Sequence, residues 1–550
     1  MKIFYRSKQV YFYILLCIFF LIITTPVILP FFYKGYFPTH DGEWAVIRLT
    51  DMYRELKDKQ IPPRFSGNLN FGYGYPLFNF TYPFPYYAGI VIYLLHFGFV
   101  NSIKILFISS VLFSAVSMFF VSKTLWNSTL AGFISSTAYV YVPYRMVDLF
   151  VRGSLGESLS FALFPAILFC VIKLLRTGKD IYGIFLAILY GILVQTHNIM
   201  AIFFSIFLLL FILGSLFYIR YKSIKKIVFF LLLGVGASAF FWLPALVEKK
   251  HILLSYVPIT DRSLYFVTFS QLFFSKWGYG APASSDGFTY QIGIPFVLIL
   301  LITLIVLISK KRSTIFNTVN TQALVLVGIT ILFFPLLFKE SEIVWRLPFL
   351  SEINYPWILL GMLGFLLSLL SGFVAAKPFW RFVAVCCVLV NIFLVLPHAK
   401  PQYFVDRGDT YYMTNDATTT SSNELMPIWV KKFPLRRPEN KAVLIKGRGL
   451  VETEKLSSRR ITFTANLQTD GVVRINTIYY PGWILEGSKR SIAYDNPQGV
   501  MEIPLSKGMN KISLVFKETL FRSVCDLLSL FSLFIIAVLF VKQIKVLKVN

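Results

Sequence analysis

Acidic residues, and charged residues in general, are scarce in this sequence of 550 residues. Asp and Glu number 27 against 53 Lys and Arg, and the four types together make up only 15%, whereas soluble domains carry about 25%. Hydrophobic residues reach 56% and include 57 Phe. Because a single soluble core stops growing at roughly 250–300 residues, an ordinary soluble enzyme and a disordered chain are both excluded. The composition predicts a protein that crosses a membrane several times.

Cysteine is scarce as well, and nucleotide-binding motifs are lacking. The five Cys residues lie within or beside apolar runs, without the spacing of a metal site, which favours simple apolar packing. The sequence has no Walker loop, and its Gly-Tyr-Gly elements at 72–74 and 278–280 lack a strand–helix setting. No nucleotide site is therefore predicted, and an outward-facing enzyme would need a donor delivered in the membrane.

Long apolar runs supply the membrane crossings, since a crossing helix needs about 20 mostly apolar residues. The run at 86–99 has only 14 residues, which suits an interfacial or re-entrant helix. The first run lacks a small-residue cleavage site behind it, so we expect it to stay as an anchor. We predict an all-α bundle of about twelve transmembrane helices, at 11–32, 104–122, 129–146, 157–175, 181–196, 199–218, 227–246, 291–309, 322–338, 356–374, 380–397 and 521–541.

Charge orients this bundle. With both termini in the cytoplasm, the cytoplasmic pieces carry 19 Lys or Arg and one acid, Asp180, as the positive-inside rule requires. Topology and anionic membrane lipids then account for the basic excess, so nucleic acid is not an expected partner. The cytoplasmic pieces are 1–10, 123–128, 173–180, 219–226, 310–321, 375–381 and 542–550.

The outer side receives two long pieces. Loop 33–103 contains residues 42–58, whose apolar side chains share one helical face, so we expect a short amphipathic helix. Residues 398–520 are polar and alternating, as at Ile461 and Phe463, which predicts antiparallel strands in an extracytoplasmic β-sandwich. The predicted units are a membrane module over 1–397, the β-sandwich over 398–520, and a final helix with a cytoplasmic tail over 521–550.

Charged and polar residues near the spans gather at their outer ends. A transporter usually needs ionisable or broken-helix sites near the bilayer midplane, so this pattern favours an outward-facing enzyme that takes a lipid-linked substrate. The residues expected to converge are Asp41, Glu43, Arg145, Asp148, Arg152, Glu157, His197, Asn198 and, in the last span, Asp526.

Several motifs resemble those of the GT-C superfamily of membrane glycosyltransferases. They are the acidic first outer loop His40-Asp41-Gly42-Glu43, the amphipathic helix after it, and the later outer turn PYRMVDLFVRGSLGES. The chain looks still more like a prokaryotic membrane family labelled as related to 6-pyruvoyl-tetrahydropterin synthase. The matching stretches span most of the chain and are PTHDGEW, PPRFSGNLNFGYGYPLFNF, RGSLGES, THN, SKWGYG…DGFTYQIG and YYPGW.

The resemblance implies a GT-C fold in a prokaryotic plasma membrane. It also implies inverting transfer of a sugar from a polyprenyl-phosphate donor to an extracytoplasmic glycan, lipid or protein acceptor. Asp41 would be the general base, and Arg152, or as second choice Arg346, would hold the donor phosphate. The resemblance leaves a divalent metal (Mg²⁺ or Mn²⁺) open, although the sequence offers no clear set of three carboxylates. The other residues assigned to substrate binding are His40, Glu43, Glu157, His197 and Asn198.

Two positions depart from the pattern of this superfamily. Gly42 separates Asp41 from Glu43, where several GT-C families have adjacent acids. Ile358 follows the Pro356-Trp357 pair, where relatives often have Arg, which weakens a phosphate-binding role for that segment.

Simpler roles stay open for these residues. Asp41 also suits the N-cap of the helix that follows it, and Glu43 suits compensation of the helix dipole. Arg152 and Glu157 suit a structural ion pair, and His197 with Asn198 suits a polar turn. For the whole chain, the alternatives are a lipid or polysaccharide flippase or transporter, and a non-catalytic scaffold for envelope assembly.

Overall fold

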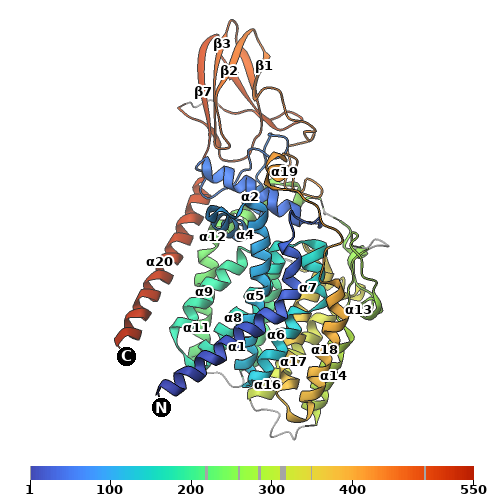
Figure 1. Cartoon of the computed structure of the whole chain (residues 1–550). Coiled ribbons are helices and arrows are strands. Elements are labelled where there is room, and N and C mark those ends of the chain that lie inside the picture. Colours follow the sequence, from blue (N-terminus) through green and yellow to red (C-terminus); the bar gives the residue numbers. More distant parts are fainter. Residues whose placement is uncertain are drawn as a thin grey trace.

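The computed structural model has two parts, a large bundle of helices and a smaller region of strands at one end of it (Figure 1). Both termini lie at the opposite end of the bundle from the strands. The structure describes residues 2–216, 221–257, 260–282, 287–309, 318–348, 350–487 and 491–549. Four predicted cytoplasmic pieces, 1–10, 219–226, 310–321 and 542–550, therefore lie partly outside the described residues.

Eight helices in the described part of the chain are long and apolar enough to cross a membrane, which makes this a multi-pass membrane protein. Helix α17 (Leu359–Ala375) is buried along its whole length and forms the centre of the bundle. The eight spans are Val10–Phe32 (α1, Lys2–Ile28, with η1, Leu29–Phe32), Phe99–Trp126 (α5), Leu155–Thr177 (α8), Asn198–Ser215 (α10), Thr318–Leu337 (α16, Thr318–Phe333, with η8, Phe334–Leu337), Pro356–Ala375 (η11, Pro356–Ile358, with α17), Pro378–His398 (α18, Arg381–Val395, with its flanking turns) and Leu520–Lys545 (within α20, Leu520–Val549).

The remaining predicted spans are shorter or broken helices, so the count of twelve stays a prediction. The run predicted at 129–146 is interrupted: α6 (Thr129–Val140) ends before Val142, and α7 (Pro143–Val147) starts at a proline. Val142 is extended, as the residue before a proline tends to be. The run predicted at 227–246 is bent by 69° between its two helices. The helices concerned are α11 (Tyr221–Ala237) with α12 (Ala239–Glu248), α9 (Asp180–Val194) and α14 (Ile294–Ile308).

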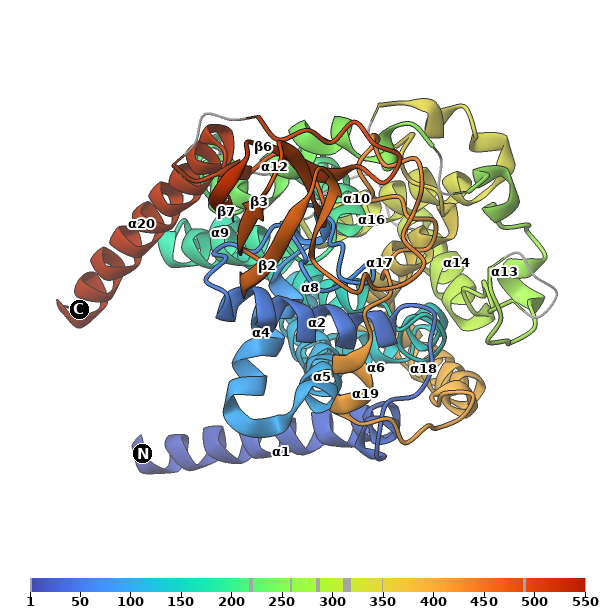
Figure 2. The ribbon, with the colours of Figure 1, turned by 90° about the horizontal axis from the view of Figure 1, so that it is seen from above.

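Two helices of the first outer loop lie across the end of the bundle, below the strands (Figures 1 and 2). Helix α2 (Gly42–Lys57) is the predicted amphipathic helix, and it buries Ala45, Leu49 and Met52 on one face. Helix α4 (Phe84–Ile92) continues into η2 (Tyr93–Phe97) and covers most of the 14-residue run expected to be interfacial. The loop thus forms a layer between bundle and strands.

The strands form two antiparallel sheets, with the orders β1-β4-β6 and β2-β3-β7-β5. Alternate residues of β3 and β7 are buried, including Ile461, Phe463, Ile512 and Leu514, and one hydrophobic cluster takes side chains from both sheets. This alternation matches the period of two expected from the sequence. The strands are β1 (Ala442–Lys446), β2 (Gly449–Leu456), β3 (Arg460–Leu467), β4 (Gly471–Ile478), β5 (Trp483–Leu485), β6 (Val500–Leu505) and β7 (Gly508–Phe516).

Residues 399–441, all of which the structure describes, contain no strand and cross over the first outer loop. Their helix α19 (Asp409–Thr414) packs against α2. The Asp409 carboxylate accepts hydrogen bonds from the backbone N–H groups of Phe99 and Val100, at 2.8 and 2.9 Å. This segment therefore links the strand region to the outer face of the bundle.

Candidate functional site

Two backbone hydrogen bonds join the first outer loop to the turn before α8. The N–H of His40 donates to the carbonyl of Val151 at 3.0 Å, and the N–H of Asp41 donates to the carbonyl of Arg152 at 2.8 Å. This pairing joins segments more than a hundred residues apart and sets Asp41 beside Arg152. The carboxylate of Asp41 lies 3.9 Å from the guanidinium of Arg152.

Gly153 makes this close approach possible. It follows η3 (Asp148–Arg152) with a φ of +62°, a left-handed conformation that glycine adopts without strain. A Cβ at this position would lie 2.8 Å from the Cβ of Thr39 and 2.9 Å from the backbone nitrogen of Gly42. Any larger residue would therefore push the Asp41 loop away from Arg152.

We expect Gly153→Ala to destabilise the protein more than Gly178→Ala and to lower any activity that depends on Asp41. Gly178 has a nearly identical φ of +66° but nothing within 4 Å of its Cβ position. Both substitutions carry the left-handed strain of about 1–2 kcal/mol, and only Gly153→Ala adds the clash with Thr39 and Gly42. Thermal unfolding of the two variants in detergent measures the difference, and equal losses would contradict this account of the loop.

Arg152 is the centre of a network of polar contacts. Its Nη1 contacts the carboxylate of Glu157 directly and donates to the hydroxyl of Tyr144 at 3.1 Å. Tyr144 in turn donates to the other oxygen of Glu157 at 2.7 Å. The guanidinium lies over the ring of Trp357, 4.7 Å from its centroid, in cation–π contact. These contacts fix the guanidinium and leave Nη2 beside Asp41.

Asp41 is the accessible acid of this network. Its side chain is 43% exposed, whereas those of Asp148 and Glu157 are fully buried. Although Asp41 is the N-cap residue of α2, its side chain makes no capping hydrogen bond; the hydroxyl of Thr39 accepts from the N–H of Gly42 instead, at 3.0 Å. The capping role that the sequence also allowed is therefore performed by Thr39, and the Asp41 carboxylate is free to face solvent or a substrate.

His197 joins the network from the start of α10. Its Nδ1 accepts from the N–H of Met200 at 3.3 Å, so the neutral ring carries its proton on Nε2, which lies 3.9 Å from Glu157. Burial lowers the pKa of His197 to about 4, which keeps the ring neutral near pH 7. Asn198, the first residue of α10, is exposed. The sequence also allowed His197 and Asn198 a purely structural role as a polar turn. His197 has such a role in part, because its ring caps the start of α10.

The structure places the other sequence-predicted residues outside these contacts. Glu43 accepts from Arg407 at 2.9 Å and from Tyr412 at 3.2 Å, so it binds the segment that crosses the outer loop. His40 contacts the carbonyl of Tyr279 at 3.3 Å, and burial lowers its pKa. Arg346 is largely exposed and pairs with Glu342 at 3.3 Å. Across the described ranges, no group of three or more His, Cys, Asp or Glu is arranged to hold a metal ion.

Two aromatic residues of the network were not predicted from the sequence. Tyr144 bridges Arg152 and Glu157, and Trp357 covers the guanidinium. Aromatic residues are common at the ends of membrane helices, so nothing in the sequence distinguishes Tyr144. Trp357 belongs to the Pro356-Trp357 pair that the family resemblance singled out, and this pair at the start of a span is the signal that could have found it.

The arrangement has the elements of a general-base site. A carboxylate that is accessible and held by its backbone can accept a proton from a hydroxyl that docks within hydrogen-bond distance. The neighbouring guanidinium is itself immobilised by Glu157, Tyr144 and Trp357, so the distance between the two groups is set by the fold.

No protein-family model and no curated protein matches this chain. Solved structures resemble it weakly, each with a TM-score of 0.46. One is the arabinofuranosyltransferase AftD from Mycobacteria, at 14% identity over 70% of this chain and 27% of that chain. Two others are of the Archaeoglobus fulgidus oligosaccharyltransferase, in the apo form at 12% identity (75% and 60% covered) and with an inhibitory peptide and a dolichol-phosphate at 13% identity (76% and 61% covered). The chain thus spans about a quarter of the first protein's length and about three fifths of the second's.

Proposed function

We propose that this protein is a GT-C-type membrane glycosyltransferase with Asp41 as its general base. It would transfer a sugar from a polyprenyl-phosphate donor to an acceptor hydroxyl outside the cytoplasm, in a prokaryotic plasma membrane. The observation that supports this most is the accessible carboxylate of Asp41, held 3.9 Å from the immobilised guanidinium of Arg152. Asp41 directly precedes α2, which lies at the bundle end that faces the strands (Figure 1). A lipid-linked donor would reach that end through the membrane.

In the proposed reaction, Asp41 accepts the proton of the acceptor hydroxyl as its oxygen attacks the anomeric carbon. The bond between that carbon and the phosphate oxygen breaks, and polyprenyl phosphate leaves with the bonding electrons. A single displacement inverts the anomeric configuration. Arginine suits the charge that grows on the leaving phosphate, but Glu157 already contacts Arg152. We therefore propose that the main role of Arg152 is to position Asp41, and that contact with the donor phosphate is its secondary role.

The predicted units then have separate roles. The membrane module over 1–397 would bind the donor from the side, and the region over 398–520, proposed as a β-sandwich, would position the acceptor. The final helix α20 holds that region to the outer loop and the bundle. Arg64 of the outer loop pairs with Glu518, just before α20, and with Asp526 in α20, at 3.1 and 2.9 Å, and donates to the Phe240 carbonyl of α12 at 2.6 Å. The acceptor, whether glycan, lipid or protein, would approach between the two units.

The test is transfer by the purified full chain in lipid vesicles. Radiolabelled polyprenyl-phosphate mannose, glucose and arabinofuranose are offered in turn with an extract of envelope glycans and lipids, and the anomeric configuration of the product is determined by NMR. We expect transfer from one donor with inversion. Transfer with retention would overturn the single displacement, and movement of labelled lipid across the bilayer without transfer would favour a flippase.

A further inference from the structure

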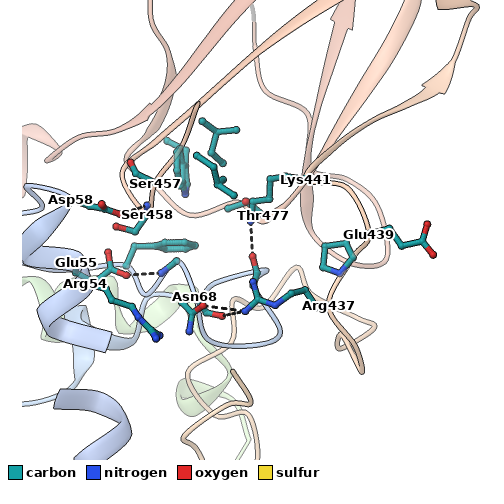
Figure 3. Close-up of a pocket in the computed structure, with 17 residues that line it drawn as sticks. Arg54, Glu55, Asp58, Asn68, Arg437, Glu439, Lys441, Ser457, Ser458 and Thr477 are labelled. Atoms are coloured by element: carbon teal, nitrogen blue, oxygen red, sulfur yellow. Dashed lines mark hydrogen bonds between the residues drawn. The ribbon is translucent and has the colours of Figure 1, made fainter. Parts of the chain in front are cut away.

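A second site candidate lies away from Asp41, where the far end of α2 meets the strands. A cavity of about 350 Å³ opens there between α2, the loop after it and strands β2 to β5. Figure 3 shows Arg54, Glu55 and Asp58 on the α2 side and Lys441 and Thr477 on the side of the strands, while the carboxylate of Glu439 points away from the cavity. The volume of this cavity falls at the lower end of the range for small-molecule sites, roughly 300–1,000 Å³.

The floor of this cavity carries polar groups without partners. Thr477 and Trp483 are 2% and 3% exposed, and neither the Thr477 hydroxyl nor the indole N–H of Trp483 has a hydrogen-bond partner among the described residues. Nη1 of Arg54 is likewise buried without a partner there. Leaving a buried polar group unpaired costs about 1–3 kcal/mol, so three such groups in residues that line one cavity favour a ligand that pairs with them. The three atoms are closed to water in this conformation, and such a ligand would reach them after a small shift of the cavity wall.

The charged rim is already held by the protein itself. Lys441 donates to the carbonyls of Gly72 and Asn476 at 2.5 and 3.0 Å, and the carboxylate of Asp58 accepts from the N–H of Ser458 at 2.6 Å. Arg437 donates to Asp416 at 2.9 Å. Three basic residues of the lining, Arg54, Arg437 and Lys441, are balanced by the three acids Glu55, Asp58 and Glu439. The cavity therefore offers little net charge to a ligand, and burial also lowers the pKa of Lys441, to about 7.

Apolar surface completes the site. Phe65 and Trp483 meet edge to face, with ring centroids 5.8 Å apart, and Ile461 and Leu456 line the same cavity. A near-neutral site that combines apolar side chains with a few unpaired donors matches a ligand with both hydroxyl groups and apolar C–H faces. A pyranose has this combination, whereas a phosphate or a peptide carboxylate would need uncompensated positive charge.

We propose that this cavity binds a neutral pyranose unit of the acceptor, and that the acceptor is therefore an extended glycan. This inference rests on the proposed function for the role of the bound glycan, but binding itself does not. Helix α2 begins next to Asp41 and reaches the cavity at Arg54, roughly 20 Å away at 1.5 Å per residue. A glycan whose end lies at Asp41 would reach the cavity several sugar units back from that end.

The test is saturation-transfer-difference NMR on the full chain in detergent, without any donor. The probes are maltotriose, methyl α-mannoside, N-acetylglucosamine and glucuronic acid. We expect signals from at least one neutral probe and a three- to tenfold weaker affinity in Thr477→Val and in Trp483→Phe, since each substitution removes one hydrogen bond of about 0.5–1.5 kcal/mol. Thr462→Val, a matched change on β3 outside the cavity, should leave binding unchanged.

Each other outcome counts against the proposal. No signal from any neutral probe, unchanged affinity in both cavity variants, or preference for glucuronic acid would overturn it. Thermal unfolding of each variant shows whether the strand region is still folded; if Trp483→Phe unfolds it, Thr477→Val alone decides. Because the measurement needs no sugar transfer, neutral-sugar binding in a protein without transfer activity would contradict the proposed function and leave the cavity assignment standing.

Discussion

Asp41→Asn should reduce sugar transfer by about 10²- to 10⁴-fold, the usual contribution of a positioned general base. The amide has the size of the carboxylate but cannot accept the proton of the acceptor hydroxyl. The two backbone hydrogen bonds that set the loop beside Arg152 involve no side chain of Asp41, so the fold and donor binding should survive. The measurement compares initial rates of transfer from the labelled donor by both proteins, together with their thermal unfolding.

A matched control separates this effect from a general loss of negative charge on the outer face. Asp406 is an exposed acid that pairs with Lys34 at 2.7 Å on the same outer segment that binds Glu43 through Arg407. Asp406→Asn should transfer sugar at nearly the native rate. Equal rates for native protein and Asp41→Asn would remove Asp41 from the chemistry, and equal losses in both variants would show that surface charge, not a base, is responsible.

Elements with a local signal could be predicted from the sequence. The helix over 42–58 follows from the spacing of Ala45, Leu49 and Met52, because a period of 3.6 residues needs no knowledge of the partner surface. The buried faces of β3 and β7 follow in the same way from a period of two. Breaks such as the one at Pro143 carry a local signal too, but an apolar run continues past them and conceals the change of direction.

The candidate site could be predicted only in part, because its contacts are not local. The proximity of Asp41 to Arg152 depends on backbone bonds between segments more than a hundred residues apart, and side-chain patterns do not encode these. Arg346 had a suitable side chain, yet the fold exposes it beside Glu342. Thr477 lies on an ordinary strand, and only the packing of α2 against the strands turns its hydroxyl into part of a cavity.

Arg522→Met should lower the free energy of unfolding by about 3–5 kcal/mol, the usual result of removing one partner of a buried ion pair. Arg522, at the start of α20, makes two hydrogen bonds to Glu248 of α12, at 2.8 and 2.7 Å, and its side chain is fully buried. Glu248 also accepts from Tyr480 of the strand region and from Asn79 of the outer loop, both at 2.9 Å. The substitution leaves that carboxylate buried without its cation, where the bundle, the loop and the strands meet.

The double variant Glu248→Gln with Arg522→Met distinguishes an unpaired charge from lost packing. Glutamine still accepts from Tyr480 and Asn79 but carries no charge, so most of the loss should be recovered, since replacing both partners of a buried pair is often nearly neutral.

Arg346→Met is the matched control, because its pair with Glu342 is exposed and such pairs contribute about 0–1 kcal/mol. Unfolding by denaturant in detergent gives all three values. A loss for Arg522→Met no larger than that for Arg346→Met would mean that Glu248 does not hold the strand region to the bundle. The acceptor cavity would then need another anchor to keep its place relative to Asp41.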